Sequence, residues 1–424
     1  MNNLSRLLTF AAFLAVIPAF AGNWPQFHGP NIDRVSDETD LPTTWSATEN
    51  LVWKRELPGI GNSCPIIWDN AIFITTYTGE GAGIERHLFR IDPKSGETIW
   101  QKSIPVWHAE DPFRGYITEH GYASNTPVTD GERIYCYFGK AGVYAFDFDG
   151  KQLWKAETGD SSSRRVWGSA SSPVLYGDNV IIPAGDEMRA IVALNKETGD
   201  VAWKAEGDRM ESSYGTPVVM KVSDERDDLI FALQNEVWGM NPDTGKLRWF
   251  AEYNLPGNMS NTVSIAGDIL TISGGFPRTA RVALKGGGKG DMSDSLLYDT
   301  QKPATYMTAP VLHEGTLYWI SDSGIAFAAK PGEEDPIWEE RMEGLEGAGG
   351  RGKPFYASPI LADGKIYAVS RANGVFVIDP STEGLKVLAQ NKIEGDASLF
   401  NASIAVSGGK IYLRSEKVLY CIGQ

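Results

Sequence analysis

From residue 51 to the end of the chain, short apolar stretches alternate with turns rich in Gly, Asp and Pro. This pattern predicts short β-strands joined by tight turns. The clearest example is the stretch 193–203, in which a strand leads into a turn that ends at Gly199, and Trp203 lies on the returning strand. Similar stretches lead to four other tryptophans, which are Trp100, Trp154, Trp249 and, in weaker form, Trp338.

A second pattern marks the start of each repeat. A Ser or Thr lies one or two places before a Pro, and an apolar pair and a turn residue follow it. Six copies keep the proline, namely Pro65, Pro127, Pro173, Pro217, Pro310 and Pro359. Two degenerate copies contain Ile265 and Ile404 instead. Eight copies at a spacing of about 45 residues predict eight stacked structural units.

The spacing of the tryptophans supports the same count. From Trp53 to Trp249, five tryptophans follow one another at intervals of 46 to 54 residues. Trp338 lies 89 residues further on, which is two intervals with one tryptophan missing. The fifth unit has therefore lost its tryptophan, and in the seventh unit Leu388 stands where a tryptophan would.

The two ends of the repeat region predict how the structure closes. Trp53 precedes the first proline pattern, whereas the eighth copy has room for three strands before the chain ends at Gln424. The strand 51–57 is therefore expected to complete the last unit. A sheet repeat closed in this way is an all-β, eight-bladed β-propeller of four-stranded antiparallel blades, spanning residues 51–424.

The residues before the repeats fall into two segments. Residues 1–21 have the features of a secretory leader, with Arg6, an apolar run from Leu7 to Phe20 and a small-residue cleavage site at Ala21. The alternative, an uncleaved anchor, is disfavoured because the run is too short to span a bilayer comfortably. Residues 22–50 are predicted to be an extended segment. We expect an exported protein, periplasmic or extracellular, with no membrane span after cleavage.

Composition excludes some functions. The formal net charge of −15 argues against binding nucleic acid. The cysteines Cys64, Cys136 and Cys421 have neither disulfide-framework nor zinc-site spacing, so we expect buried free thiols. The five histidines show no ligand spacing either, and no metal site is predicted.

The repeats of the form Ala-x-Asp-x-x-Thr-Gly-x-x-x-Trp resemble the pyrroloquinoline-quinone (PQQ) type of propeller repeat over essentially all of residues 51–424. The segments 24–30 and 43–46 resemble exported propellers of unassigned function from planctomycete-type bacteria. BamB, of the outer-membrane β-barrel assembly machinery, and the quinoprotein dehydrogenases share the repeat. The resemblance implies that one set of tryptophans docks each blade on its neighbour: Trp53, Trp100, Trp154, Trp203, Trp249 and Trp338.

The resemblance also raises the question of a PQQ cofactor with calcium. The quinoprotein dehydrogenases carry a pair of adjacent cysteines and a calcium set of Glu, Asn and Asp. No two cysteines are adjacent here, and no calcium carboxylate is recognisable. We therefore expect no cofactor and no catalytic residues, with PQQ-dependent oxidation as a less favoured alternative.

Ligand-binding residues are expected on the long loops at one face of the propeller. Arginines gather in these loops and predict a cationic channel mouth for a carboxylate- or sulfate-bearing ligand, with tryptophans for a sugar ring or flat cofactor. The candidates are Arg164, Arg165, Trp167, Arg351, Arg371, Trp107 and His108. The alternative is that these arginines pair with loop acids and bind nothing.

Two further loop patterns are weaker. His108, Glu119 and His120 would suit acid–base chemistry, but their spacing matches no known site and favours loop packing. Residues 286–290 resemble a phosphate-binding loop only in composition, and we expect a flexible blade loop there.

Taken together, the sequence favours a monomeric, non-catalytic, exported propeller that binds an envelope protein or another ligand as a scaffold. An alternative is the binding or processing of an acidic polysaccharide, an anionic glycan, at the arginine-rich mouth. Because fold does not determine function, the choice rests on the site itself.

Overall fold

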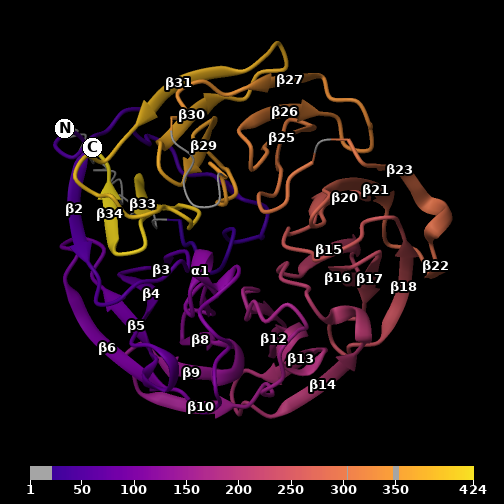
Figure 1. Ribbon diagram of the computed structural model, residues 1–424, viewed down its shortest axis with the longest axis horizontal. Helices are drawn as coiled ribbons and strands as arrows, with labels where there is room; N and C mark the ends of the chain where they lie inside the picture. Colours follow the sequence, from indigo (N-terminus) through magenta and orange to yellow (C-terminus); the bar gives the residue numbers. More distant parts are fainter. Residues whose placement is uncertain (1–21, 303, 347–352) are drawn as a thin grey trace, which may run out of the picture.

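Eight antiparallel sheets are arranged as blades around a central channel in the computed structural model of this chain (Figure 1). The structure describes residues 22–302, 304–346 and 353–424. The predicted leader, residues 1–21, and the candidate Arg351 lie outside the described residues. The predicted all-β, eight-bladed propeller is confirmed.

The first four blades follow one another along the chain, and each has its first strand next to the channel and its fourth at the rim. Their strands are β3 (Ile66–Trp68), β4 (Ala71–Thr78), β5 (Glu85–Ile91) and β6 (Thr98–Pro105); β7 (Val128–Thr129), β8 (Arg133–Tyr137), β9 (Val143–Asp147) and β10 (Gln152–Ala156); β11 (Val174–Tyr176), β12 (Asn179–Ala184), β13 (Ala190–Asn195) and β14 (Val201–Glu206); β15 (Val218–Ser223), β16 (Arg226–Leu233), β17 (Glu236–Met240) and β18 (Leu247–Glu252).

The remaining blades complete the ring in the same order. Their strands are β19 (Ser264–Ala266), β20 (Ile269–Gly274), β21 (Ala280–Lys285) and β23 (Leu296–Thr300); β24 (Val311–His313), β25 (Thr316–Ile320), β26 (Ile325–Ala329) and β27 (Trp338–Arg341); β28 (Ile360–Ala362), β29 (Lys365–Ser370), β30 (Gly374–Asp379) and β31 (Lys386–Asn391); β32 (Ala405–Ser407), β33 (Lys410–Arg414) and β34 (Val418–Ile422).

The eighth blade takes its outer strand from the beginning of the repeat region. Strand β2 (Leu51–Glu56) pairs antiparallel with β34, and Lys54 lies opposite Tyr420. The predicted closure of the ring is confirmed, and the strand ends one residue earlier than expected. The two ends of the propeller are therefore held together by a backbone ladder, which removes the exposed sheet edges that an open array would leave there.

In five blades the tryptophan of the outer strand contacts the turn of the next blade. The indole N–H of Trp154 donates to the carbonyl of Lys196 at 2.8 Å, and that of Trp53 donates to Pro93 at 3.0 Å. A Cβ added at Gly199 would lie 2.6 Å from the Trp154 ring, and φ there is +77°. Glycine is required on both counts. Because Trp53 belongs to the eighth blade and Pro93 to the first, this contact also seals the ring.

The fourth blade departs from this arrangement. Strand β22 (Gly290–Asp291), which belongs to the turn of the fifth blade, pairs in parallel with β18, with Gly290 opposite Trp249. The indole N–H of Trp249 donates to the carboxylate of Asp228 in its own blade at 2.7 Å. The loop 286–290 was expected to be flexible, but it ends in this short strand, because the outer edge of β18 offers unpaired backbone groups.

Residues 22–50 cross the propeller on the side of the tight turns. Trp24 forms an antiparallel bridge with Ile67, and β1 (Val35–Ser36) pairs in parallel with β28. The carboxylate of Glu38 accepts hydrogen bonds from the backbone N–H groups of Gly408 and Gly409, at 2.8 and 2.7 Å. The extension therefore contacts the first, seventh and eighth blades, on both sides of the junction.

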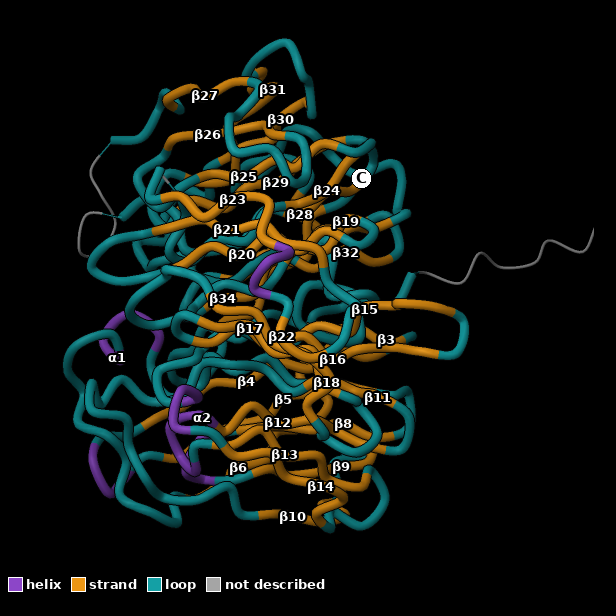
Figure 2. The backbone as a smooth tube through the Cα atoms, turned by 90° about the vertical axis from the view of Figure 1, so that its right-hand side faces the viewer, coloured by secondary structure: helices purple, strands orange, loops and turns teal. Residues whose placement is uncertain are grey.

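Apolar clusters between adjacent sheets form the core, and the three cysteines lie within buried structure as free thiols, as predicted. The long loops, with the short helices α1 (Ile117–His120) and α2 (Gly185–Met188), project from the opposite face to the tight turns (Figure 2). Within the described residues there are also four 3-10 turns: η1 (Gly81–Gly83), η2 (Gly139–Ala141), η3 (Asp208–Met210) and η4 (Ser293–Ser295). Within the described ranges, no helix has the length and apolar character needed to cross a membrane.

Candidate functional site

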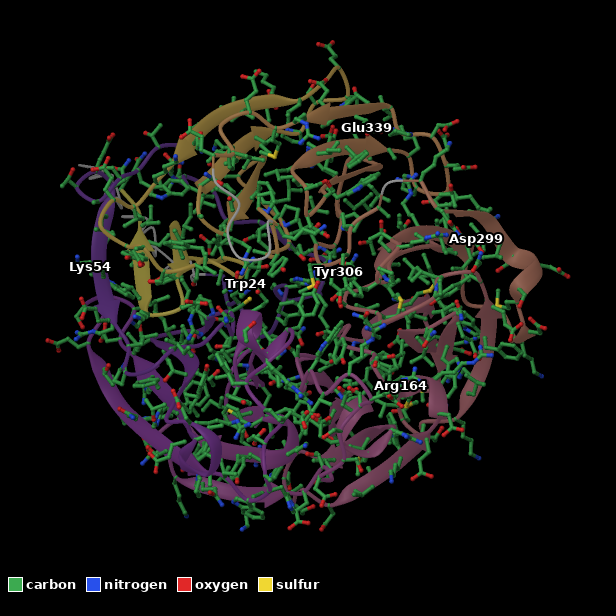
Figure 3. The ribbon with its side chains drawn as sticks, in the orientation of Figure 1. Trp24, Lys54, Arg164, Asp299, Tyr306 and Glu339 are labelled. Atoms are coloured by element: carbon green, nitrogen blue, oxygen red, sulfur yellow. The ribbon has the colours of Figure 1, made fainter. Side chains whose placement is uncertain are left out.

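The central channel holds a cavity of about 140 Å³. Its walls come from the starts of the first strands and from the long loops, and His28 of the N-terminal extension also lines it. In Figure 3, Tyr306, which lines the cavity, and Trp24 of the N-terminal extension lie near the middle of the ring. Arg164 lies further out. We refer to this space as the channel cavity.

Aromatic side chains from four loops pack together where the channel cavity meets the long-loop face. The Tyr116 ring lies 4.5 Å from Trp167, 5.9 Å from Phe276 and 5.8 Å from Tyr306, measured between ring centroids. The guanidinium of Arg165 lies over Trp167 at 4.7 Å and over Phe276 at 5.6 Å. The stacked arrangement compensates the charge of Arg165 through the ring faces.

Helix α1 is fixed across the channel by a buried ion pair. Arg371, at the end of β29, donates from Nη2 to Glu119 at 2.6 Å, and from Nε to Asn401 at 2.7 Å. The same guanidinium lies 4.0 Å from the ring centroid of Tyr356. His120 makes a hydrogen bond from Nε2 to the carbonyl of Trp167 at 2.8 Å. These contacts join the first, third, seventh and eighth blades above the cavity.

The other end of the channel cavity is closed by the N-terminal extension. Arg34 is buried and donates to the carbonyl of Pro310 at 2.9 Å and to the hydroxyl of Ser264 at 2.9 Å. Its Nη1 lies 3.3 Å from Nδ1 of His28. Burial, with a smaller contribution from Arg34, holds the pKa of His28 well below its usual value near 6.5. His28 is therefore neutral at physiological pH.

Two adjacent carboxyl groups are buried beside the channel, on α2. Tyr137 donates to Glu187 at 2.7 Å, and the backbone N–H of Ser212 donates to Asp186 at 2.8 Å. Burial, and then the neighbouring Asp186, raise the pKa of Glu187 to about 8, and burial raises the pKa of Asp186 to about 6. Glu187 therefore holds a proton at neutral pH.

The raised pKa of Glu187 makes the stability of the fold depend on pH. A raised pKa means that the folded state binds more protons than the unfolded state between about pH 4.5, the usual value, and about pH 8. The free energy of unfolding should therefore fall as the pH rises through this window, by up to about 1.4 kcal/mol per pH unit. Urea unfolding of the wild type and of E187Q at several pH values measures this. Between about pH 6 and pH 8, above the pKa of Asp186, the variant should lose most of the slope, and an unchanged slope there would contradict the assignment.

The structure separates the predicted ligand-binding residues. Arg165 and Trp167 belong to the aromatic cluster, and Arg164 is exposed on the same loop. Arg371 is fully buried against Glu119 instead of facing a ligand. Trp107 contacts Lys155, with the ammonium 3.5 Å from its ring centroid, and neither it nor His108 is among the residues that line the channel cavity.

Several arginines of the long-loop region are paired within the protein, whereas Arg114, Arg164 and Arg278 are exposed. Arg86 pairs with Glu110 at 2.7 Å, and Arg414 is buried and donates to Ser63 and Thr75 at 2.7 Å. Arg189 lies within 4 Å of acidic side chains. For these residues the alternative interpretation, pairing within the protein, is the one the structure shows. The suggested acid–base set is also not assembled, since Glu119 binds Arg371 and His120 binds the Trp167 carbonyl.

The residues present do not fit PQQ with calcium. PQQ is a tricarboxylate, and among the described residues that line the channel cavity none is Arg or Lys. Burying carboxylates without a cation is costly. The described part of the chain also brings together no group of three or more His, Cys, Asp or Glu side chains suited to a metal ion. The one cysteine lining the cavity is Cys64.

Several residues of the site were missed from the sequence. Four residues that line the channel cavity lie in segments outside the repeat pattern, so no repeated motif marks them. They are His28, Tyr116, Tyr306 and Tyr356. The signal that pointed toward them was positional, because each lies in a segment that interrupts the repeat. Arginine content alone was a poorer guide, since several arginines serve the fold.

Sequence comparisons relate the chain to one family. The family model described as outer membrane protein assembly factor BamB matches residues 85–340. The outer membrane protein assembly factor BamB of Burkholderia pseudomallei (strain K96243) is 26% identical over 139 residues. That match covers 33% of this chain and 28% of the relative. The chain therefore matches less than a third of the length of the Burkholderia protein.

Structural comparisons find the same fold in two functional classes. BamB from Moraxella catarrhalis superimposes with a TM-score of 0.60 at 12% identity, covering 88% of this chain and 99% of that one. A europium-containing methanol dehydrogenase gives 0.64 at 11% identity, covering 95% and 98%. The quinohemoprotein alcohol dehydrogenase from Comamonas testosteroni gives 0.61 at 11% identity, covering 95% and 81%. At such identities the likeness shows the fold alone.

Proposed function

This chain belongs to the family described as outer membrane protein assembly factor BamB, and from that premise we propose that it is an exported, non-catalytic scaffold that binds a partner protein in the cell envelope. The binding surface is the long-loop face. The observation that carries this proposal is Phe113, whose side chain is 55% exposed on the longest loop.

Phe113 is accompanied by groups suited to a protein interface. Arg114 and Arg164 are exposed, and the two loops that carry them adjoin, because Gly115 packs against Trp167. The Phe113 ring lies 6.0 Å from Tyr122, which gives it a fixed support. Aromatic residues and arginine are the types that contribute most at protein interfaces. The surface formed by Phe113, Arg114 and Arg164 fits a partner with an apolar pocket edged by carboxylates.

The interior of the propeller supports a non-catalytic role. Two acid–base pairs near the channel are engaged, Arg371 with Glu119 and Lys140 with Asp111, at 2.6 and 2.7 Å. A catalytic acid or base needs to reach a substrate proton, and these groups are held by contacts that also join the blades.

A photo-crosslinking experiment tests the proposal. A photoreactive residue placed at Phe113 in cells should give a protein adduct of defined mass, and R164A should reduce its yield about ten-fold or more. The matched control position is Val201, an exposed apolar residue on the outer strand β14, which should give no such adduct. Equal adducts at both positions, or none at Phe113, would refute the long-loop face as the binding surface.

A further inference from the structure

We infer that the channel cavity is a binding site for one small uncharged aromatic molecule, about the size of a single six-membered ring and carrying a hydroxyl group. Nothing in this inference depends on a partner protein at the long-loop face. It rests on the size of the cavity, on polar atoms left without partners in its wall, and on the charge of its lining.

The size of the cavity sets the size of the ligand. Its volume is about 140 Å³, close to the roughly 150 Å³ of an engineered apolar cavity that binds benzene. Tyr116, Trp167 and Tyr306 present ring atoms to this space. Aromatic rings pack favourably against one another in edge-to-face or offset geometry, so a monocyclic aromatic ligand suits these walls.

Two deeply buried side chains in the wall carry polar atoms that have no hydrogen-bond partner within the described structure. They are Nε2 of His28 and the hydroxyl oxygen of Tyr356. The two residues are 2% and 8% exposed. Oδ1 of Asn62, a third residue of the lining, is also without a partner there. Buried polar groups are nearly always paired, so these atoms call for a bound group.

The contact with Arg34 determines what His28 offers. The guanidinium can only donate, so Nδ1 of His28 accepts from Nη1 at 3.3 Å. Neutral imidazole then carries its proton on Nε2, which is a donor toward the ligand. Asn62 Oδ1 is an acceptor, and the Tyr356 hydroxyl is both. A hydroxyl group on the ligand can accept from His28 and donate to Asn62 or Tyr356.

The lining selects against charge. Among its described residues the one carboxylate is Glu119, which is already paired with Arg371, and there is no Arg or Lys. A carboxylate on the ligand would be buried without a cation, and that is strongly unfavourable. Most of the hydroxyls near the cavity are also occupied, as when Thr216 accepts from the backbone of Ser172 at 3.1 Å. A sugar ring with several hydroxyls would therefore leave donors unpaired.

Calorimetric titration with three probes tests the inference. Phenol should bind at least about ten-fold more tightly than toluene, which has the same shape without the hydroxyl, and than benzoate, which adds a charge. Phenol should also raise the melting temperature. Equal affinity for phenol and toluene would overturn the hydroxyl assignment, and the absence of binding by any probe would show that the cavity holds only water.

Two variants and a matched control test whether phenol binds in the channel cavity. Y356F and H28N should each weaken phenol binding about ten-fold, with toluene unaffected. Asn suits position 28 because φ there is +64° and its amide oxygen replaces Nδ1 as the acceptor for Arg34. Y318F, which removes a hydroxyl from between the sixth and seventh blades, should not change binding. Unfolding of each variant without ligand checks that the fold is kept. Equal phenol affinity in all three variants would refute the site.

Discussion

Replacement of Arg371 by methionine is expected to lower the free energy of unfolding by about 3–5 kcal/mol. The guanidinium is 0% exposed and holds Glu119 at 2.6 Å, so its removal breaks a buried ion pair. Methionine keeps most of the side-chain volume, so the loss comes from charge and hydrogen bonding more than from a void. Urea denaturation at neutral pH measures the difference.

The control for this variant is an exposed ion pair. K302M breaks the contact of Lys302 with Glu334 and Asp335, at the surface of the fifth and sixth blades. Such pairs contribute about 0–1 kcal/mol. The double variant R371M/E119Q should recover part of the loss, because it removes the buried negative charge together with the positive one. If R371M cost no more than K302M, the pair across the channel would not be a main connection between the blades.

Trp249→Ala is the second change with a large expected effect, again about 3–5 kcal/mol. Trp249 is 0% exposed, and its indole packs against Gly239 in the apolar cluster between the fourth and fifth blades. Truncation opens a cavity in this cluster and removes the indole donor to Asp228, a fully buried carboxylate that also pairs with Arg226 and Arg248. Thermal and urea unfolding should both show the loss.

Two comparisons separate packing from hydrogen bonding. W249F keeps an aromatic ring and should cost less than W249A, and the remaining difference from the wild type reports the lost N–H bond to Asp228. W53A removes the corresponding tryptophan where it is only half-buried, and it should also cost less. An effect of W249A no greater than that of W53A would show that the deeper burial of Trp249 adds no stability.

The repeat made the architecture predictable from sequence. Four of the tryptophans meet a turn glycine across a blade boundary, as Trp154 meets Gly199, so their spacing reports the spacing of the blades. The position of Trp53 before the first complete unit predicted closure for the same reason. The residues that make these contacts recur at a nearly constant spacing along the sequence, so one sequence is enough to recognise the repeat.

The site was less predictable, because its contacts join positions that share no interval. The sequence predicted Arg371 as a ligand-binding residue. In the structure it pairs with Glu119, which is 252 positions away in the chain. His28 lies in a segment outside the repeats, and its role follows from Arg34 and from the channel above it. Local sequence carries little information about such long-range pairs, which depend on the finished ring.

The closure of the ring also sets the order in which the molecule is assembled. Lys54 and Tyr420 are paired in the eighth blade, and Glu38 binds Gly408 and Gly409, so the first residues of the propeller obtain their partners only after the last have been made. Contacts of such high sequence separation slow folding, because a long loop must close before they form. During synthesis, Trp45 therefore remains exposed apolar surface until Tyr367 of the seventh blade, against which it packs, has been made.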